Sequence, residues 1–481
     1  MARTLFPLVL LVGACGSVTY GTRDEAFGAA VQATLDGESL GAAQGAHVFL
    51  SSAANDDPRY DRAQILLAQA SEALGLGYAA SLLYLDVASS RRDVDQLDKA
   101  FAGLERIVMG PTPFDEPTLV DGFLATAHIT GLSPERQAFI DYLQGRHSLK
   151  QGLDAWADKQ LAAIAPRSPY RSRADYVKAV RLLQRGELKA AKKALTKLLE
   201  RHEEVDDVLD AVPVPEDVVV DTRLALARLA MERERYDEAV GRYEQVRSEA
   251  TRRPELLLEM AWAHYYRGDS RRALGLLIAL DAPVYGGLIA PERYLLEARV
   301  LRRLCQFEPA RTAARRLEHR HGRALSELHA GIAPEASEAL IAGARQRGQG
   351  RAAARFVRRL EKERALVESD SGALGSKLST TLLEVYDLGL QEARRRERAA
   401  LEAESLRLSH ELLMAEDGVR LTLHELSVGL LRGRRRPRGP EELSSFNIEA
   451  GGGSTVYRFI GEFWTDELDD MVVLIDDRCI R

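Results

Sequence analysis

Hydrophobic residues recur at helical spacing through most of the chain, and small residues recur with them at a longer period. The clearest stretch is Val220–Asp281, where two amphipathic helix pairs lie in register 34 residues apart. In the first helix of each pair, Ala227 aligns with Ala261. In the second helix, Ala239 aligns with Ala273. Because two helices approach closely only where their side chains are small, this pattern predicts repeated helix hairpins.

The same helix-pair pattern recurs along the chain, and we number the positions of each repeat from its first residue. Each repeat has a small residue at position 8, alanine at position 20 and a large aliphatic residue near the end of its second helix. The copies begin at Asp61, Ala138, Ser172, Val220, Pro254 and Pro291. Position 8 holds Ala68, Gly145, Ala179, Ala227, Ala261 and Ala298, and position 20 holds Ala80, Ala157, Ala191, Ala239, Ala273 and Ala310. An alanine-rich helical chain would match by chance in one place or two. So many copies in register favour a true repeat.

The pattern resembles the tetratricopeptide repeat (TPR), whose signature has a small residue at position 8 and alanine at position 20. The resemblance implies an all-α fold, a TPR-like right-handed α-solenoid of helix hairpins, over residues 59–364. We assign residues 15–58 to a tether and capping helices, and residues 432–453 to a basic and glycine-rich linker.

Residues 365–431 follow the repeats and contain a long amphipathic stretch. Ser379–Glu416 has no proline and keeps leucine and alanine at helical spacing, so we expect one long helix there. This helix either forms a coiled coil or packs along the end of the array, and Arg420–Leu431 could pair with it.

The end of the chain changes character to β-branched and aromatic residues. Thr455–Trp464 and Met471–Ile480 flank the turn Thr465–Asp470, which predicts a small β-hairpin in residues 454–481. A lone hairpin is marginal in water, so it must pack on the helices or join a partner's sheet. This segment, with GEFWTDELDD, resembles the closing segments of TPR envelope proteins of predatory and gliding deltaproteobacteria.

The first residues carry the features of a secretory signal. Arg3 precedes the apolar run Leu5–Val12, which is too short to span a membrane. Val12–Cys15 reads Val-Gly-Ala-Cys and resembles the bacterial lipobox. The resemblance implies that residues 1–14 are removed and that Cys15 is acylated, and Gly16 after it favours the outer membrane. The alternative is an ordinary signal peptide with an incidental cysteine.

Composition narrows the function classes only a little. The chain has 481 residues, 46% hydrophobic and 29% charged, as expected for an ordered helical protein. Its net charge of −6 gives no field that would attract nucleic acid. The arginine-rich stretch with Arg315, Arg316, Arg355, Arg358 and Arg359 has interleaved glutamates, which favours a solvated helix face.

Catalytic and metal motifs are missing from the sequence. It contains no Gly-x-Ser-x-Gly, no His-Glu-x-x-His and no phosphate-binding loop, so we expect no enzyme, no cofactor and no small-molecule ligand. His319, His321 and His329 have no cysteine or carboxylate that completes a metal set, so we expect exposed helix histidines. If Cys15 is lipidated, Cys305 and Cys479 remain, either as a disulfide or as two buried thiols.

The TPR resemblance implies that positions 2, 5, 9, 12 and 13 of each first helix line a concave groove. These positions give Tyr142, Arg146, Lys150, Tyr176, Arg228, Trp262, Tyr265, Tyr266, Arg299, Arg302 and Arg303. Aromatic residues flanked by arginines suit an extended or helical peptide that bears carboxylates. The alternative is that aromatics such as Trp262 pack between repeats. Several asparagines that grip a peptide backbone in the family are absent, which argues against a carboxylate clamp.

Together these features predict a membrane-anchored, periplasm-facing lipoprotein that serves as a protein-binding scaffold or assembly factor. Motility, pilus, secretion and outer-membrane biogenesis machines are the expected settings. A glycan- or peptidoglycan-handling enzyme is an alternative. It would need carboxylates in a cleft, and the DELDD cluster lies on a short turn, which is unlike such a cleft. A soluble cytoplasmic adaptor is the second alternative, and it requires a different interpretation of the N-terminus.

Overall fold

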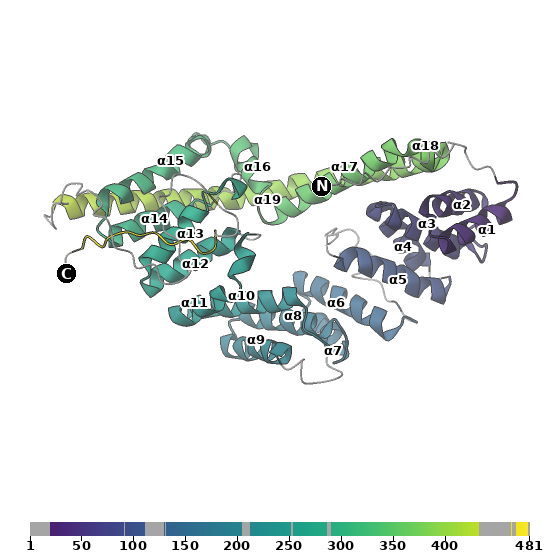
Figure 1. Ribbon diagram of the computed structural model, residues 1–481, viewed down its shortest axis with the longest axis horizontal. Helices are drawn as coiled ribbons and strands as arrows, with labels where there is room; N and C mark the ends of the chain where they lie inside the picture. The colour runs from purple at the N-terminus through teal and green to yellow at the C-terminus, as the bar shows by residue number, and fades with distance from the viewer. Residues whose placement is uncertain are drawn as a thin grey trace, which may run out of the picture. The chain divides into compact units, whose positions relative to one another are not determined.

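The computed structural model describes a protein of helix hairpins in two compact units. The described residues are 20–90, 92–110, 129, 131–203, 212–251, 254–285, 290–431, 463 and 468–479. The first unit comprises Met1–Tyr170 and Ala352–Glu397, and the second comprises Arg171–Arg351 and Arg398–Arg481. Figure 1 labels the helices of both units.

The first unit is built from consecutive helix pairs. Its helices are α1 (Arg23–Leu35), α2 (Ser39–Ser52), α3 (Tyr60–Ala73), α4 (Gly77–Ser90), α5 (Val94–Met109), α6 (Pro134–Lys150) and α7 (Asp154–Ala163). The pairs α1–α2, α3–α4 and α6–α7 are in contact as hairpins. The short helix α18 (Ser371–Leu374) also belongs to this unit.

The second unit repeats the same plan. Its helices are α8 (Arg171–Gln184), α9 (Leu188–Glu203), α10 (Glu216–Glu232), α11 (Tyr236–Glu244), α12 (Pro254–Arg267), α13 (Ser270–Ala279), α14 (Glu292–Arg303), α15 (Phe307–His329) and α16 (Glu338–Ala344). Short 3₁₀ turns are η3 (Arg247–Thr251), η4 (Pro283–Tyr285) and η5 (Pro334–Ala336). The pairs from α8–α9 to α14–α15 form hairpins. Helices α17 (Gly348–Ser369) and α19 (Ser376–Leu431) contribute residues to both units.

The predicted helix hairpins are confirmed, and their small residues lie in the hairpin contacts. All alanines at position 20, from Ala80 to Ala310, are 0% exposed, and so are the alanines at position 8. At Gly145 an added Cβ would lie 2.6 Å from the Leu161 side chain. At Gly145 the paired helices α6 and α7 therefore lie too close for a larger residue, and the alanines at positions 8 and 20 are fully buried in the other hairpins.

The turn inside each hairpin uses the left-handed conformation at position 15. Gly75, Gly152, Gly186 and Gly268 have φ between 71° and 99°. The other two repeats place Glu234 (φ 57°) and Cys305 (φ 54°) at this position. Glycine is favoured there because it has no Cβ to clash with the preceding turn. The pair α1–α2, predicted only as a cap, fits the same register with Ala30, Gly37 and Ala42.

The predicted long helix is present as α19, which runs without a break from Ser376 to Leu431. The suggestion that Arg420–Leu431 pairs with it is wrong, because those residues continue the same helix. In the first unit, α19 and α17 pack on α3 and α4. The hydroxyl of the buried Tyr386 donates to Glu363 Oε2 at 2.8 Å, and the Tyr78 backbone N–H donates to the same carboxylate at 2.9 Å.

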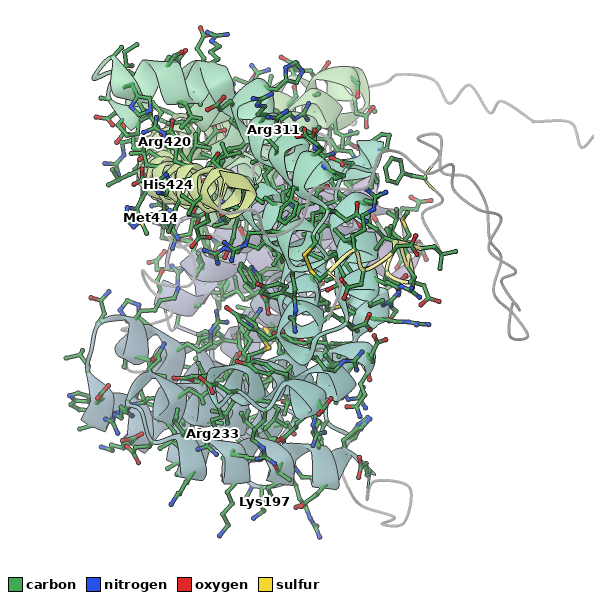
Figure 2. All side chains as sticks on the ribbon, turned by 90° about the vertical axis from the view of Figure 1, so that its left-hand side faces the viewer. Lys197, Arg233, Arg311, Met414, Arg420 and His424 are labelled. Carbon is green, nitrogen blue, oxygen red and sulfur yellow. A yellow bond between two sulfur atoms is a disulfide. The ribbon has the colours of Figure 1, made fainter. Side chains whose placement is uncertain are left out.

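In the second unit, the later part of α19 packs on the helix hairpins. Leu408 and Leu412 are fully buried in the same core cluster as residues of α12 to α16. At Gly418 an added Cβ would lie 2.7 Å from the Leu295 side chain, so glycine permits this close approach. The other face of α19 carries Met414, Arg420 and His424, which Figure 2 labels, and it is exposed.

The predicted C-terminal β-hairpin is not supported, because the described residues contain no strand. Its first strand lies outside the described residues apart from Phe463, and its second strand is irregular over residues 471–479. Buried and exposed side chains still alternate along this segment. Met471, Val473 and Ile475 pack on the helical core, whereas Val472 and Leu474 are exposed. An extended segment on helices shows the same period of two as a strand in a sheet.

This C-terminal segment is held on α13 and α14 by several kinds of contact. The Val473 N–H donates to Arg271 O at 3.1 Å, and Arg272 Nη2 donates to Asp469 O at 2.7 Å. A disulfide joins Cys305 to Cys479 across a sequence separation of 174 residues. A disulfide stabilises a domain by about 2–4 kcal/mol, and by more when it closes a longer loop.

We predict that Ala191→Leu lowers the free energy of unfolding by about 1–3 kcal/mol, because it overpacks the contact between α8 and α9. The neighbouring Ala190 is exposed on the same helix, so Ala190→Leu is the matched control. Thermal melts of the two variants would measure the difference. Equal melts would show that the small residue at position 20 does not limit the approach of the helices.

We also predict that Gly275→Ala detaches the C-terminal segment. An added Cβ would lie 1.9 Å from the backbone oxygen of Met471, so the segment must move away from α13. Under reducing conditions, protease should cleave near residues 468–479 faster in this variant than in the wild type. Gly241→Ala on α11 is the control, because its Cβ would meet nothing within 4 Å. Unchanged cleavage of Gly275→Ala would contradict this packing.

Candidate partner-binding site

Three aromatic residues share one face of α12 in the second unit, because they follow the helical spacing of three and four residues. Trp262 stacks on Tyr266 with ring centroids 5.4 Å apart, and Tyr265 meets both rings edge-on. Tyr236 at the start of α11 extends the stack, with its ring 5.1 Å from that of Tyr266. Stacked and edge-on rings at these distances attract one another beyond the area they bury.

Two arginines of α14 lie against these rings. Arg299 occupies the same repeat position as Trp262 in the next repeat, and its guanidinium carbon lies 5.9 Å from the Trp262 ring. The Arg303 guanidinium carbon lies 5.5 Å from the Tyr265 ring, and its Nη1 donates to Tyr265 O at 2.7 Å. That carbonyl belongs to the last turn of α12, where backbone oxygens lack a partner within the helix. We name Tyr236, Trp262, Tyr265, Tyr266, Arg299 and Arg303 the aromatic–arginine patch.

Part of this patch is open to solvent. Tyr266 is 46% exposed, whereas Trp262 is half-buried against the core. A depression of about 440 Å³ lies beside Tyr236 and Tyr266, with charged residues of both signs from the turn before α11 and from Arg267. The patch therefore offers an apolar surface with a polar rim, which is the usual anatomy of a protein-binding surface.

Two of the predicted groove arginines are already paired with a carboxylate of the chain. Arg228 donates to both oxygens of Glu259 at 2.8 Å, and this hydrogen bonding raises the pKa of the Arg228 guanidinium. Arg302 forms an ion pair with Glu425 of α19. By contrast, Arg299 has no salt bridge with a described residue. Burial raises the pKa of the nearby Glu292, and the charge of Arg299 opposes that shift.

The remaining predicted groove residues lie elsewhere. Tyr142 and Arg146 belong to the first unit, where Tyr142 is buried beside Tyr170 with the rings 5.5 Å apart. Tyr142 therefore belongs to the core and not to an accessible surface. Tyr176 of the second unit is half-buried, and its hydroxyl donates to Asp221 O at 3.5 Å. Lys150 is exposed on the first unit.

The sequence missed two residues that shape the site. Tyr236 is the first residue of a second helix, whereas only first-helix positions were assigned to the groove. Glu259 neutralises Arg228 from the next repeat, 31 residues later, and it also accepts from the Tyr243 hydroxyl at 3.0 Å. The repeat pattern marks neither residue, because the positions equivalent to Tyr236 hold residues as different as Gly77, Asp154 and Ser270.

The three clustered histidines of α15 have different surroundings. The expectation that all three are exposed is wrong for His321, which is buried with its ring 5.8 Å from that of Tyr294. Burial, with the charges of Arg320 and Arg293, lowers the pKa of His321 to about 4. His329 pairs with Glu416 at 2.9 Å. Within the part of the chain that the structure describes, no three His, Cys, Asp or Glu side chains could hold a metal ion together.

The predicted lipidation site and signal lie in residues 1–19, outside the described residues. Over the described helices, none combines the length and the apolar character that a membrane-spanning segment needs.

Comparisons with known proteins add little to this geometry. No family model matches the chain, and no curated protein matches it either. Among solved structures, a tetratricopeptide repeat protein from Parabacteroides merdae has 14% sequence identity and a TM-score of 0.26. The match covers 61% of this chain and 91% of that one. This similarity is too weak to establish the fold. The fold follows from the helix hairpins and their buried small residues described above.

Proposed function

We propose that the protein is a non-catalytic binding scaffold and that a protein partner docks on the aromatic–arginine patch. The observation that carries this proposal is the stack of the half-buried Tyr236 and Trp262 on the exposed Tyr266, with Arg299 beside it. Aromatic and arginine side chains dominate the energetics of protein interfaces, because they bury a large area at a small entropic cost.

The patch favours a particular kind of partner. An aromatic or aliphatic side chain would pack on the exposed face of Tyr266. A carboxylate three or four residues away on a helix, or nearby on an extended peptide, would reach Arg299, which can donate two parallel hydrogen bonds. We therefore propose an acidic peptide segment with an apolar anchor as the bound element.

We further propose that the scaffold is a lipoprotein that faces the periplasm in a cell-envelope machine. This part of the proposal is supported by the sequence alone, through Arg3, the apolar run Leu5–Val12 and Cys15. Several acyl chains on one terminus would give stable anchoring, whereas one chain would be marginal. Motility, pilus, secretion and outer-membrane biogenesis assemblies remain the settings we propose.

We predict that Trp262→Ala combined with Arg299→Glu abolishes recovery of the partner. Truncating an interface anchor costs about 2 kcal/mol or more, a loss of some thirty-fold in affinity. The matched control is Trp156→Ala combined with Lys159→Glu on α7, where Lys159 Nζ lies 5.3 Å from the exposed Trp156 ring.

The measurement is crosslinking in cells, followed by affinity purification and quantitative mass spectrometry. Thermal melts of each purified variant would confirm that it remains folded. Proteins that are lost from the patch variant but kept by the control would be its partners. Full recovery with the patch variant would place binding elsewhere.

We predict that Cys15→Ala prevents acylation and leaves an unprocessed or soluble form, because the thiol is the atom that receives the lipid. Metabolic labelling with a fatty-acid analogue, together with mass spectrometry of the mature N-terminus, would test this. Label that persists in Cys15→Ala, or a mature N-terminus at another residue, would contradict the lipoprotein proposal. The docking proposal would remain open to its own test.

A further inference from the structure

The C-terminal segment, residues 468–479, crosses two successive hairpins of the second unit. It contacts the N-terminal part of α13, where Arg272 Nη1 donates to Met471 O at 3.1 Å. It ends beside the turn between α14 and α15, where the Arg478 N–H donates to Leu304 O at 3.0 Å. The segment therefore connects the hairpin α12–α13 to the hairpin α14–α15.

Both of these attachments are closely fitted. At α13, Gly275 lets the segment approach, since an added Cβ would lie 1.9 Å from a backbone oxygen of the segment. At the turn after α14, the side chain of the buried Gln306 donates to Asp476 O at 2.9 Å. The disulfide between Cys305 and Cys479 makes this second attachment covalent.

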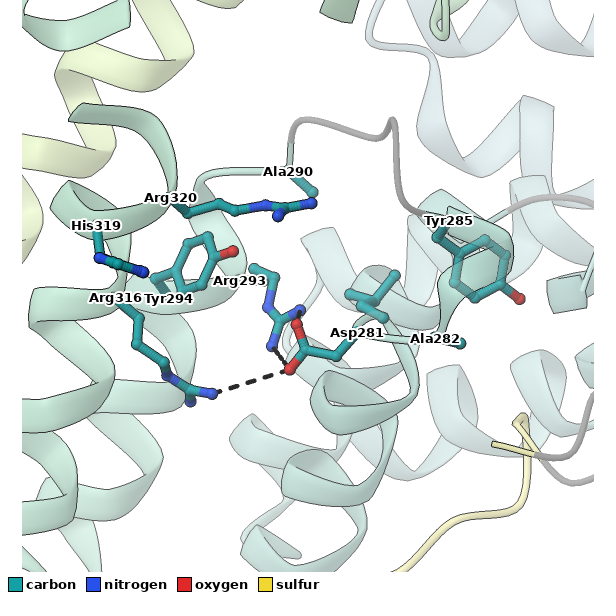
Figure 3. Close-up of a pocket in the computed structure, with 10 residues that line it drawn as sticks. Asp281, Ala282, Tyr285, Ala290, Arg293, Tyr294, Arg316, His319 and Arg320 are labelled. Carbon is teal, nitrogen blue, oxygen red and sulfur yellow. Dashed lines mark hydrogen bonds and ion pairs between the residues drawn. The ribbon is translucent and has the colours of Figure 1, made fainter. Parts of the chain in front are cut away.

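The two hairpins are already joined at the other end of α13. The chain itself passes there from the end of α13 to the start of α14, and Arg293 Nη2 donates to Asp281 Oδ2 at 2.7 Å. Figure 3 shows this pair, with Arg316 of α15 also directed toward Asp281. Both connections lie at the C-terminal end of α13, whereas the C-terminal segment contacts its N-terminal part. The segment therefore joins the two hairpins at the edge that the chain connection leaves open.

The aromatic–arginine patch lies at this same edge. Tyr265 and Tyr266 are in the last turn of α12, which leads into α13 through the turn at Gly268, and Arg303 is the last residue of α14. Arg303 Nη1 donates to Tyr265 O at 2.7 Å and so joins the two hairpins directly. The Cys479 sulfur lies 3.1 Å from Arg303 O. The disulfide therefore contacts a residue of the patch.

The geometry of the patch depends on the angle between the two hairpins. In a repeat array each hairpin contacts only its neighbours, so local contacts set this angle. The guanidinium carbons of Arg299 and Arg303, on α14, lie 5.9 Å and 5.5 Å from rings of α12. Helix α14 is about 18 Å long, so a rotation of about 5° around its first residue would move its last residue by about 1.6 Å. A connection across the open edge opposes this rotation.

We propose that the C-terminal segment is a redox-sensitive brace that fixes the aromatic–arginine patch in its binding geometry. With the disulfide closed, Arg299 and Arg303 are held beside the rings before a partner arrives, so binding has to create less order. Reduction leaves the segment with its non-covalent contacts alone and loosens the open edge. The effect on a partner rests on the docking function proposed above, whereas the effect on the patch geometry does not.

A small dithiol supplies the reducing chemistry. Cys305 and Cys479 are both partly exposed, so a dithiol can reach the bond between them. Its thiolate attacks one sulfur, forms a mixed disulfide and releases the other cysteine as a thiolate. The second thiol of the reagent then attacks the mixed disulfide, so the reagent leaves as a cyclic disulfide. Two electrons and two protons thus pass from the dithiol to the protein.

The patch geometry can be measured without a partner through the fluorescence of Trp262, which is half-buried. The chain has three tryptophans, and Trp156→Phe with Trp464→Phe leaves Trp262 alone. We expect acrylamide to quench Trp262 more strongly after dithiothreitol opens the disulfide. Cys305→Ser with Cys479→Ser should show the stronger quenching with and without dithiothreitol. Quenching that is unchanged by reduction would overturn the brace.

Two glycine variants separate the segment from the chemistry of the reagent. Gly275→Ala loosens the segment at α13 and keeps both cysteines, so it should also strengthen the quenching, whereas Gly241→Ala on α11 should not. Equal quenching of these two variants would contradict the proposal. Leu408 and Leu412 of α19 remain in the core of the second unit, so the reduced protein should stay folded, which far-UV circular dichroism checks.

The consequence for binding is tested with the proteins that the wild type recovers and the variant with Trp262→Ala and Arg299→Glu loses. Cys305→Ser with Cys479→Ser should recover them about threefold to tenfold less well, the cost of ordering one side chain again. Equal recovery would overturn the regulatory role, and higher recovery would show that the segment blocks the site. If the patch variant itself recovers every protein, the docking proposal fails, and the quenching of Trp262 alone decides the brace.

Discussion

The structure depends on one steric constraint, the burial of small residues at positions 8 and 20 of each hairpin. Ala261 and Ala273 are both fully buried where α12 meets α13, and the same holds in the other repeats. Because position 8 faces the partner helix, positions 9 and 13 of the same helix, which are four residues apart, lie together on another side. The hairpin contact therefore aims Trp262 and Tyr266 away from the helix pair. The aromatic–arginine patch follows directly from the packing of the repeat.

Helix α19 packs on the surface of the hairpins, at positions where a helical ligand was expected to bind. It covers Leu295 and pairs with Arg302, which are position 5 and position 12 of their repeat. Gly389 in the first unit and Gly418 in the second remove the Cβ atoms that would meet Tyr78 and Leu295. Part of the repeat surface that was predicted to meet a partner is thus covered by a helix of the chain itself. Of the α14 residues predicted to contact a partner, Arg302 is therefore paired with α19, whereas Arg299 and Arg303 lie in the aromatic–arginine patch.

Local rules allowed the fold to be predicted, whereas long-range contacts limited the prediction of the site. Positions 8, 15 and 20 lie within one hairpin, so their residue types report directly on helix contact and turn geometry. The C-terminal segment was misassigned because alternation along Met471–Ile475 is the same on helices as in a sheet. This segment contacts Gly275 and Arg272, which lie some 200 positions earlier in the chain. A local sequence pattern cannot predict contacts between residues so far apart. Tyr142 was wrongly predicted to line the groove. Its position in the repeat indicates which side of the helix it is on, but not which residues of the chain cover that side.

Internal pairing decides which charges are available for recognition. The sequence contains 66 lysines and arginines against 72 acidic residues, so counting arginines cannot identify a binding site. The structure neutralises Arg228 with Glu259 and Arg302 with Glu425, and it uses Arg272 to hold the C-terminal segment. Arg299, by contrast, has no salt bridge with a described residue, and its guanidinium carbon lies 5.9 Å from the Trp262 ring. A guanidinium that is not neutralised within the chain can pair with a carboxylate of a ligand, so the docking that we propose depends on Arg299 more than on Arg228 or Arg302.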